Sequence, residues 1–284
     1  VGYDEDNEVY MIAADYQISL APVYLFQQVV PCGSSLAANL GKTIRVENFP
    51  LLWLQGGSGG YYDVYKGDTF LIAGSGCIWG GGVSDYDAVT SIDLQSQSLT
   101  TNFTSTLLKK FNNLYYLLLA NNNNVDTIDV TQNFKLGRLF FSNTLVNSID
   151  LSNNPSLTNF GCGGAELNLI DLSNNLILTE VRLWANNLSS IDLSNNTLIE
   201  TLELFANTNI TSIDISNNPL ITYIRTQSTK CDEIVNSQIL IDLDGHGLSN
   251  GYFQSSIFGS GSLTTAGATA KANLQAKGWT IVGI

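Results

Sequence analysis

One stretch of the sequence decides the fold, Leu178-Thr-Glu-Val181-Arg-Leu183-Trp-Ala-Asn186-Asn-Leu188. Its residues follow the spacing L-x-x-L-x-L-x-x-N-x-L, with valine in place of leucine at one position. Three residues later the triplet Ile191-Asp-Leu begins and leads directly into Ser-Asn-Asn. Both segments recur elsewhere in the chain, so internal repetition is the feature from which the architecture is inferred.

The triplet Ile-Asp-Leu, or a close variant of it, marks the repeat. It begins at six positions, Ile92, Ile128, Ile149, Ile170, Ile191 and Ile213. From the second copy onward the spacings are 21, 21, 21 and 22 residues. A unit of this length cannot bury its own apolar face, so successive units must stack, with strands about 4.8 Å apart. The repeat therefore predicts a solenoid.

In these features the chain resembles leucine-rich-repeat proteins from about Val89 to Thr229, specifically those with short repeats found on bacterial and phage surfaces. The resemblance implies a mainly β fold whose strands line one face. The asparagine at the ninth position of each unit is expected to hydrogen-bond the backbone where the chain leaves the strand. Thr144, Ala165 and Thr229 replace it in three units, so this ladder of asparagines should be interrupted.

The other side of each unit carries the Ile-Asp-Leu triplet. Its in-out-in alternation predicts a second short strand or an extended segment, closed by Ser-Asn-Asn turns. The repeat is too short to hold a helix on this side. Equal spacing on both faces predicts a rather straight solenoid.

Three domains are predicted, because the sequence before and after the repeats follows different patterns. Residues 1–88 hold short strand-like runs separated by Gly-rich breakers, which predicts an antiparallel, sandwich-like β-rich domain for anchoring or oligomerisation. Residues 89–229 are the leucine-rich-repeat solenoid. Residues 230–284 have helical patterns and predict an α/β C-terminal cap, which an exposed solenoid end requires.

The predicted cap contains two helices. Thr229-x-x-Asp232 is interpreted as a capping box for a first helix, which ends at the Gly-His-Gly segment 245–247. A second helix is expected over residues 265–277. The stretch Thr269–Ile281 also resembles the tails that close repeat proteins of environmental bacteria and their phages.

Charge and composition exclude several classes of function. The chain of 284 residues has 12 Lys+Arg against 25 Asp+Glu, a formal net charge of −13. Binding to nucleic acid or attachment to an anionic membrane needs a surplus of cations, so neither is expected. No apolar run reaches the ~18 residues of a membrane span, so no membrane insertion is expected.

An enzymatic function is not expected either. His246 is the only histidine, which removes most general-base chemistry at neutral pH. An enzyme would have to use carboxylates such as Glu180, Glu200 and Glu203, and these are predicted to lie on an open face without an evident pocket. A carboxylate-based glycosidase is therefore only a remote alternative.

No cofactor or metal site is predicted. The four cysteines, Cys32, Cys77, Cys162 and Cys231, form no CxxC pair, and the pairing of the first two is left open. The last two fall on inward positions of the repeat and are interpreted as core residues. The triplets place five aspartates in one column, Asp129, Asp150, Asp171, Asp192 and Asp214. Carboxylates about 4.8 Å apart repel each other, and hydrogen bonds from Ser and Thr are favoured over bound calcium as the compensation.

The candidate binding site is the outward side of the strands, where the third, fifth and seventh residues of each unit form three columns. Three of the four arginines and several aromatic residues fall there, a composition typical of binding hot spots. The candidate binding residues are Tyr116, Arg138, Phe140, Glu180, Arg182, Trp184, Glu203, Phe205, Tyr223 and Arg225. Strands favour exposed aromatics in any case, and neighbouring Arg and Glu can merely neutralise one another, so this alternative stays open.

The sequence thus predicts a non-enzymatic recognition or structural protein with a rigid binding face. The resemblance of the tail favours an extracellular phage virion surface or host-recognition component, and a bacterial secreted or cell-surface adhesin is the alternative. The expected partner is a protein or glycan on a cell surface. Residues 1–88 are expected to mediate self-association or attachment to a particle.

Overall fold

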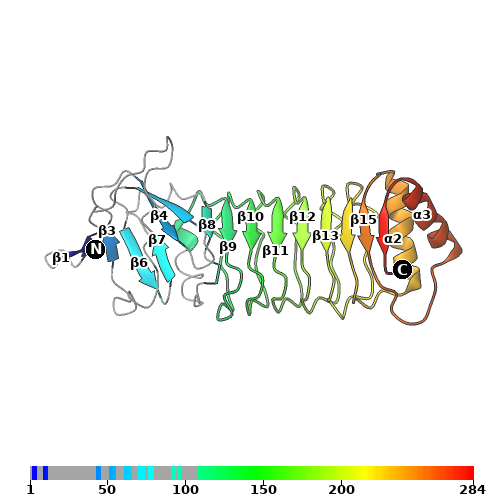
Figure 1. Ribbon diagram of the computed structural model, residues 1–284, viewed down its shortest axis with the longest axis horizontal. Coiled ribbons are helices and arrows are strands. Elements are labelled where there is room, and N and C mark those ends of the chain that lie inside the picture. The colour runs from blue at the N-terminus through cyan, green and yellow to red at the C-terminus, as the bar shows by residue number, and fades with distance from the viewer. Residues whose placement is uncertain are drawn as a thin grey trace.

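The repeats form one long parallel sheet that ends at a pair of helices (Figure 1). A computed structural model describes residues 108–284 continuously and, before them, eight short strands together with Gln95 and Ser96. The described strands belong to three sheets, of five, nine and two strands.

The first seven strands confirm that the N-terminal region is rich in β-structure. Their bounds are β1 (Gly2–Asp4), β2 (Val9–Met11), β3 (Thr43–Arg45), β4 (Leu51–Gln55), β5 (Tyr61–Tyr65), β6 (Thr69–Ala73) and β7 (Gly76–Trp79). The order β1-β2-β3-β6-β7 makes one sheet, and β4 and β5 pair as a separate hairpin. The predicted antiparallel pairing is wrong for β2 and β3, which are parallel. Parallel neighbours require a long crossover connection, and the chain between these two strands is long enough to supply one.

Strands β8 to β16 form the long sheet, in which every neighbouring pair is parallel and follows chain order. Their bounds are β8 (Ser91–Asp93), β9 (Tyr116–Leu118), β10 (Arg138–Phe140), β11 (Asn159–Gly161), β12 (Glu180–Arg182), β13 (Thr201–Glu203), β14 (Tyr223–Arg225), β15 (Tyr252–Gln254) and β16 (Thr280–Val282). A 3-10 helix, η3 (Leu108–Lys110), lies before β9. Equivalent residues of successive units face each other, as Arg182 and Glu203 do, so the predicted columns are confirmed.

The core consists of rows of apolar side chains, aliphatic for the most part, that run through the units. In the unit quoted first, Leu178, Val181, Leu183 and Leu188 have no exposed surface. Their equivalents in the other units join them in a single apolar cluster. Burial of each such side chain contributes roughly 1.5–3 kcal/mol, which no isolated unit would gain.

The bend after each strand has the same backbone geometry throughout the solenoid. The eighth residue of each unit is left-handed, with φ between 52° and 68°, in Ser96, Asn121, Asn143, Gly164, Ala185, Ala206 and Ser228. At the next position Asn186 donates to the carbonyls of Cys162 and Leu183 at 2.9 and 3.0 Å. Thr144 and Thr229 keep only the bond to the carbonyl three residues earlier, so the predicted interruption of the ladder is confirmed.

A second asparagine column, which the sequence analysis did not predict, supports the bend before each strand. It consists of Asn133, Asn154, Asn175, Asn196 and Asn218, each at most 1% exposed. Asn175 Nδ2 donates to the carbonyls of Leu151 and Asn154 at 3.1 and 2.8 Å. The Oδ1 atoms of all five accept no hydrogen bond. The position therefore needs the two N–H donors of an amide, which a hydroxyl cannot replace.

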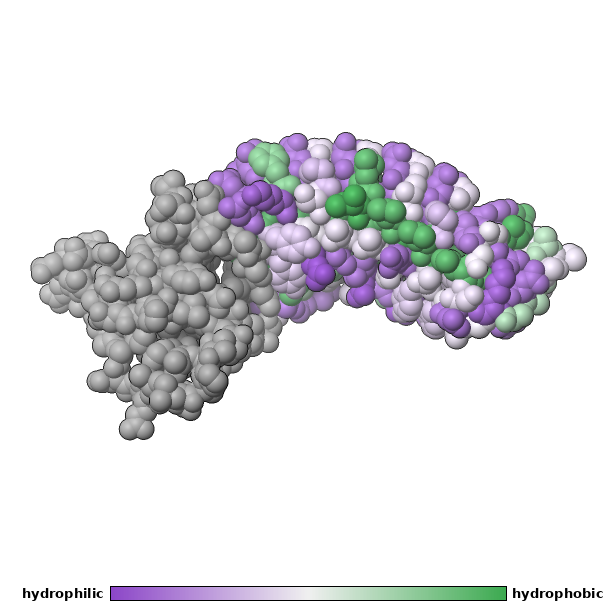
Figure 2. All heavy atoms as spheres, turned by 90° about the horizontal axis from the view of Figure 1, so that it is seen from above, coloured by the Kyte–Doolittle hydropathy of each residue, from purple (hydrophilic) through white to green (hydrophobic). Residues whose placement is uncertain are grey.

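Across residues 108–284 the back of the solenoid contains no strand, so the Ile-Asp-Leu triplets are extended segments, one of the two predicted forms. The predicted straightness is wrong, because the solenoid bends into an arc (Figure 2). Only the front side has a hydrogen-bonded sheet that holds the units at strand spacing. The back has no such ladder, so its segments are free to spread apart.

The C-terminal cap contains helix α2 (Glu233–His246) and helix α3 (Thr265–Ala276), close to the predicted ranges. The predicted capping box is wrong, because Asp232 itself caps α2 and accepts from the backbone N–H of Ile234 and Val235. A left-handed Gly247 ends this helix. An ion pair of 2.5 Å between Lys277 and Asp244 joins the end of α3 to α2. The domain boundaries after residues 88 and 229 stay predictions.

Candidate partner-binding face

The outward residues of β9 to β14, with the residue two positions after each strand, form what is called the front face below. The in-register pairing places the predicted third-position and fifth-position residues in adjacent columns on this face. Arg138 and Arg182 are exposed, and Glu203 is only 8% exposed. The structure thus brings the predicted residues together, and their role in binding stays a prediction.

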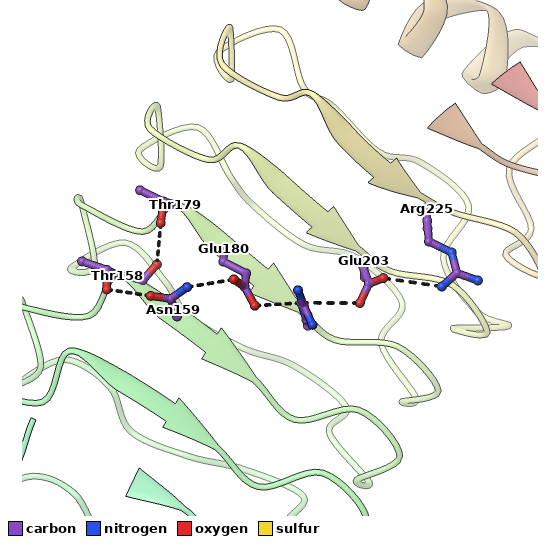
Figure 3. Close-up of polar contacts among 7 residues, drawn as sticks. Thr158, Asn159, Thr179, Glu180, Glu203 and Arg225 are labelled. Carbon is purple, nitrogen blue, oxygen red and sulfur yellow. Dashed lines mark hydrogen bonds and ion pairs between the residues drawn. The ribbon is translucent and has the colours of Figure 1, made fainter. Parts of the chain in front are cut away.

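A chain of polar contacts crosses the front face from β11 to β14 (Figure 3). Asn159 Nδ2 donates to the Glu180 carboxylate at 2.8 Å. Arg182 Nε lies 2.7 Å from Glu180 and 3.7 Å from Glu203. Arg225 reaches the other oxygen of Glu203 at 3.5 Å. Both carboxylates are therefore paired with arginine.

The same contacts distinguish the three arginines of the face. Arg182 and Arg225 neutralise carboxylates, as the alternative interpretation of the columns proposed. None of the described carboxylates lies within ion-pair distance of the exposed Arg138. Arg138 is therefore the arginine of this face that is available to an acidic group on a partner.

Two aromatic rings and one arginine stack on one another and form a continuous surface, called the aromatic ridge. The rings of Trp184 and Phe205 stack with centroids 5.7 Å apart and an angle of 7° between their planes. The guanidinium of Arg225 lies 4.2 Å from the centre of the Phe205 ring. All three side chains are half-buried, so they are fixed by their neighbours and still accessible. Such anchors lose little conformational entropy on binding.

Two glycines of the third unit make room for the aromatic rings. A Cβ at Gly163 would lie 1.9 Å from the Trp184 ring, and one at Gly161 would lie 2.7 Å from the Phe140 ring. Each ring therefore packs directly on backbone and cannot stand away from the sheet. This role was not predicted from the sequence, although glycines in the outward columns beside aromatic residues indicate it.

Further aromatic pairs extend the face at both ends. Tyr116 and Phe140 lie 6.3 Å apart in a tilted arrangement. Tyr223 stacks on Tyr252 of β15 at 5.1 Å with an angle of 15°. Tyr252 was not predicted, because it follows helix α2 and lies outside the regular spacing. It continues the third-position column into the cap.

The aspartates of the back follow the hydrogen-bonded interpretation. Asp150, Asp171, Asp192 and Asp214 each accept the backbone N–H of the serine two residues later at 2.9 Å. Hydrogen bonds from those serines lower the pKa of each carboxyl. Asp129 differs, since an ion pair with Lys109 at 2.7 Å is the main cause of its lowered pKa. These side chains therefore remain ionised at neutral pH.

The described cysteines are part of the core. Cys162 and Cys231 are free and have no exposed surface. Burial raises the pKa of both thiols, and that of Cys162 by a wide margin. A thiol that stays protonated is a poor nucleophile, so neither residue offers reactive chemistry.

Stacked units, an in-register parallel sheet and an asparagine after the strand define the leucine-rich-repeat fold, and this chain has that fold. No family model matches the sequence, and no curated protein matches it.

Solved structures of bacterial leucine-rich-repeat proteins are similar to it. The functional domain of InlJ from Listeria monocytogenes is 22% identical, with a TM-score of 0.53 over 70% of this chain and 50% of that domain. Internalin C2 of the same organism is 17% identical, with a TM-score of 0.57 over 72% of this chain and 85% of its own. A protein of Leptospira interrogans is 11% identical, with a TM-score of 0.56 over 84% of this chain and 60% of its own. At these identities the likeness shows the fold, and this chain spans only half of the InlJ domain.

The two helices of the cap were compared with the requirements of a membrane span. Neither α2 nor α3 has the length and apolar character that a membrane-spanning helix needs.

Proposed function

We propose that this chain is a non-enzymatic recognition protein that binds a partner through the front face of its solenoid. The observation that carries the proposal is the aromatic ridge, whose side chains are half-exposed and already held in place. Preorganised aromatic and arginine side chains are the usual anchors of protein interfaces. The pairing of Glu180 and Glu203 with arginine disfavours the glycosidase alternative.

The partner is proposed to be a protein or glycan on a cell surface, and the chain to act outside the cell. A phage virion surface or host-recognition component is the first candidate, favoured by the resemblance of the C-terminal tail. A bacterial secreted or cell-surface adhesin is the alternative, supported by the fold that the chain shares with the listerial internalins. In both cases residues 1–88 are proposed to anchor or oligomerise the protein.

Binding of the fluorescently labelled full chain to a panel of intact bacteria, measured by flow cytometry, tests the proposal. The double variant Trp184→Ala/Phe205→Ala should reduce binding by about tenfold or more, because it removes the ridge. The matched control Asp171→Asn/Asp192→Asn changes two back residues and should bind as the parent does. Equal binding by the ridge variant would exclude the front face as the site.

Two further measurements separate the finer alternatives. Protease treatment of the cells should abolish binding to a protein partner, and periodate treatment should abolish binding to a glycan. The mass of the full chain in solution, measured by light scattering, separates a virion component from an adhesin. A fixed oligomer is expected of the former and a monomer of the latter.

A further inference from the structure

A second surface of the solenoid, away from the front face, has the composition of a docking site. Leu176, Ile177, Leu198, Pro219 and Leu220 form what is called the apolar edge. The four aliphatic members are between 39% and 54% exposed. They lie in the bends that lead into β12, β13 and β14, and apolar surface runs continuously along this edge (Figure 2).

The fold does not require apolar residues at these positions. In each bend the buried asparagine and the following core residue anchor the chain, as Asn175 and Leu178 do. The two residues between these anchors must therefore lie on the surface of the solenoid. In the two preceding units the same places hold Phe134-Lys135 and Pro155-Ser156. The exposed aliphatics of the later units are thus a feature that folding alone leaves unexplained, and clustered exposed apolar side chains mark interaction sites.

Carboxylates border the apolar edge. On its back side runs the column of Asp171, Asp192 and Asp214, and none of the described lysines or arginines lies within ion-pair distance of these three. On its front side lies the exposed Glu200. The serine and asparagine residues of the bends, such as Ser194 and Asn195, are uncharged. The surface is therefore an apolar stripe with an acidic border.

We propose that the apolar edge docks an amphipathic helix of another protein whose apolar stripe is flanked by lysine and arginine. The charges complement each other, since the aspartate column faces the basic flank of such a helix. Apolar residues at i, i+4 and i+7 of a helix lie about 5–6 Å apart, close to the ~4.8 Å spacing of the units. Three successive units thus meet three successive helical positions with little mismatch.

The acidic border disfavours other occupants. A second copy of this chain, with its own aspartate column and a net charge of −13, would bring like charges together. An anionic membrane would be repelled for the same reason. The inference does not depend on the proposed function of the front face, which lies on a different side of each unit.

Fluorescence anisotropy with the full chain and a labelled peptide of about 14 Leu and Lys residues, patterned as an amphipathic helix, tests the proposal. The peptide should bind the parent with micromolar affinity, and Ile177→Asn/Leu198→Asn should weaken binding by roughly tenfold or more. Leu145→Asn is the matched control, because Leu145 is 44% exposed on the opposite edge and should not matter. These residues are exposed, so the variants should fold, and thermal unfolding checks this.

A scrambled peptide of the same composition, without an apolar stripe, should bind at least tenfold more weakly. Equal binding of both peptides would show simple charge attraction and overturn the proposal. Binding of phosphatidylglycerol vesicles that requires the apolar edge would overturn it in favour of a membrane. Dimerisation of the chain that Ile177→Asn/Leu198→Asn abolishes, measured by sedimentation, would overturn it in favour of a second copy.

Discussion

The front and the back of the solenoid are built from the same units and differ in almost every other respect. The front has a hydrogen-bonded sheet, and its outward residues change from unit to unit. The back has no strand in residues 108–284, and it repeats one aspartate with one serine hydrogen bond in unit after unit. The side that is held by backbone hydrogen bonds is thus the side that is free to vary its side chains.

The difference has a physical reason. On the front, strand pairing fixes the backbone, so any side chain that fits a pleated surface is tolerated in the columns. The back has no strand pairing, and there and at the bends side chains supply further hydrogen bonds to backbone groups. Identical polar residues there maintain the fold, whereas the front residues are free to vary, as the proposed recognition role requires.

The largest effect is expected at the bend before the strands. Asn175→Leu removes two buried hydrogen bonds to carbonyls that each keep one backbone donor, and it places a bulkier side chain in a fully buried site. The free energy of unfolding should therefore fall by about 3 kcal/mol. Asn186→Thr, at the bend after the strand, should cost about 2 kcal/mol. Threonine keeps the bond to the carbonyl three residues earlier, but it loses the bond to the Cys162 carbonyl and leaves the Leu167 N–H without its acceptor. Urea unfolding measures both variants. Equal losses would remove the distinction between the two bends.

A smaller effect is expected where the front face is shaped by glycine. Gly163→Ala places a methyl group in the Trp184 ring, which must move, and should lower the free energy of unfolding by about 1–2 kcal/mol. The indole N–H resonance of Trp184 should shift in the NMR spectrum. Gly245→Ala is the control, because a Cβ there meets nothing within 4 Å inside helix α2, and it should stabilise by roughly 0.5–1 kcal/mol. An unmoved indole signal would contradict the packing of this ring on backbone.

The stability that the aspartates give to the back of the solenoid should be lost in acid. Its aspartates have a pKa below the ordinary value of about 3.9, so their stabilisation is present above that pH and is lost as the pH falls through the folded pKa. Asn in place of Asp171 and Asp192 still accepts the serine N–H but does not titrate. The melting temperature of this double variant should therefore fall less than that of the parent below about pH 4. An identical acid response in both proteins would show that these carboxylates do not contribute.

The smallest effect is expected at the left-handed position of the bend after the strand. Ala206 has φ of 61°, which strains an alanine and suits glycine. Ala206→Gly should raise the free energy of unfolding by about 0.5 kcal/mol in chemical denaturation, since relief of strain outweighs the added chain entropy. A loss of stability would show that this backbone position is not strained.

Much of the fold follows from spacing in the sequence. The Ile-Asp-Leu and L-x-x-L-x-L patterns predict the solenoid, the inward rows and the outward columns, because in a stacked repeat the period alone decides which residues coincide. The boundaries of the two cap helices follow from glycine and capping signals. The capping residue itself was misassigned, since Thr229 and Asp232 are both good caps and only the start of α2 decides between them.

The sequence predicts which residues belong to the candidate site, but not how their side chains are oriented. The columns place Trp184, Phe205 and Arg225 near one another, but stacking depends on ring orientation, which the glycines of the neighbouring unit decide. Tyr252 was missed because a helix separates it from the regular spacing. The pairing of Glu203 with both Arg182 and Arg225 likewise depends on the side-chain conformations that the sheet allows.

The sequence by itself determined the repeat, the buried rows and the acidic back, because each depends only on residue type and period. The tertiary structure alone decided the curvature, the second asparagine column, the paired charges of the front and the apolar edge. These depend on which groups meet across units, and that is fixed only when the units stack.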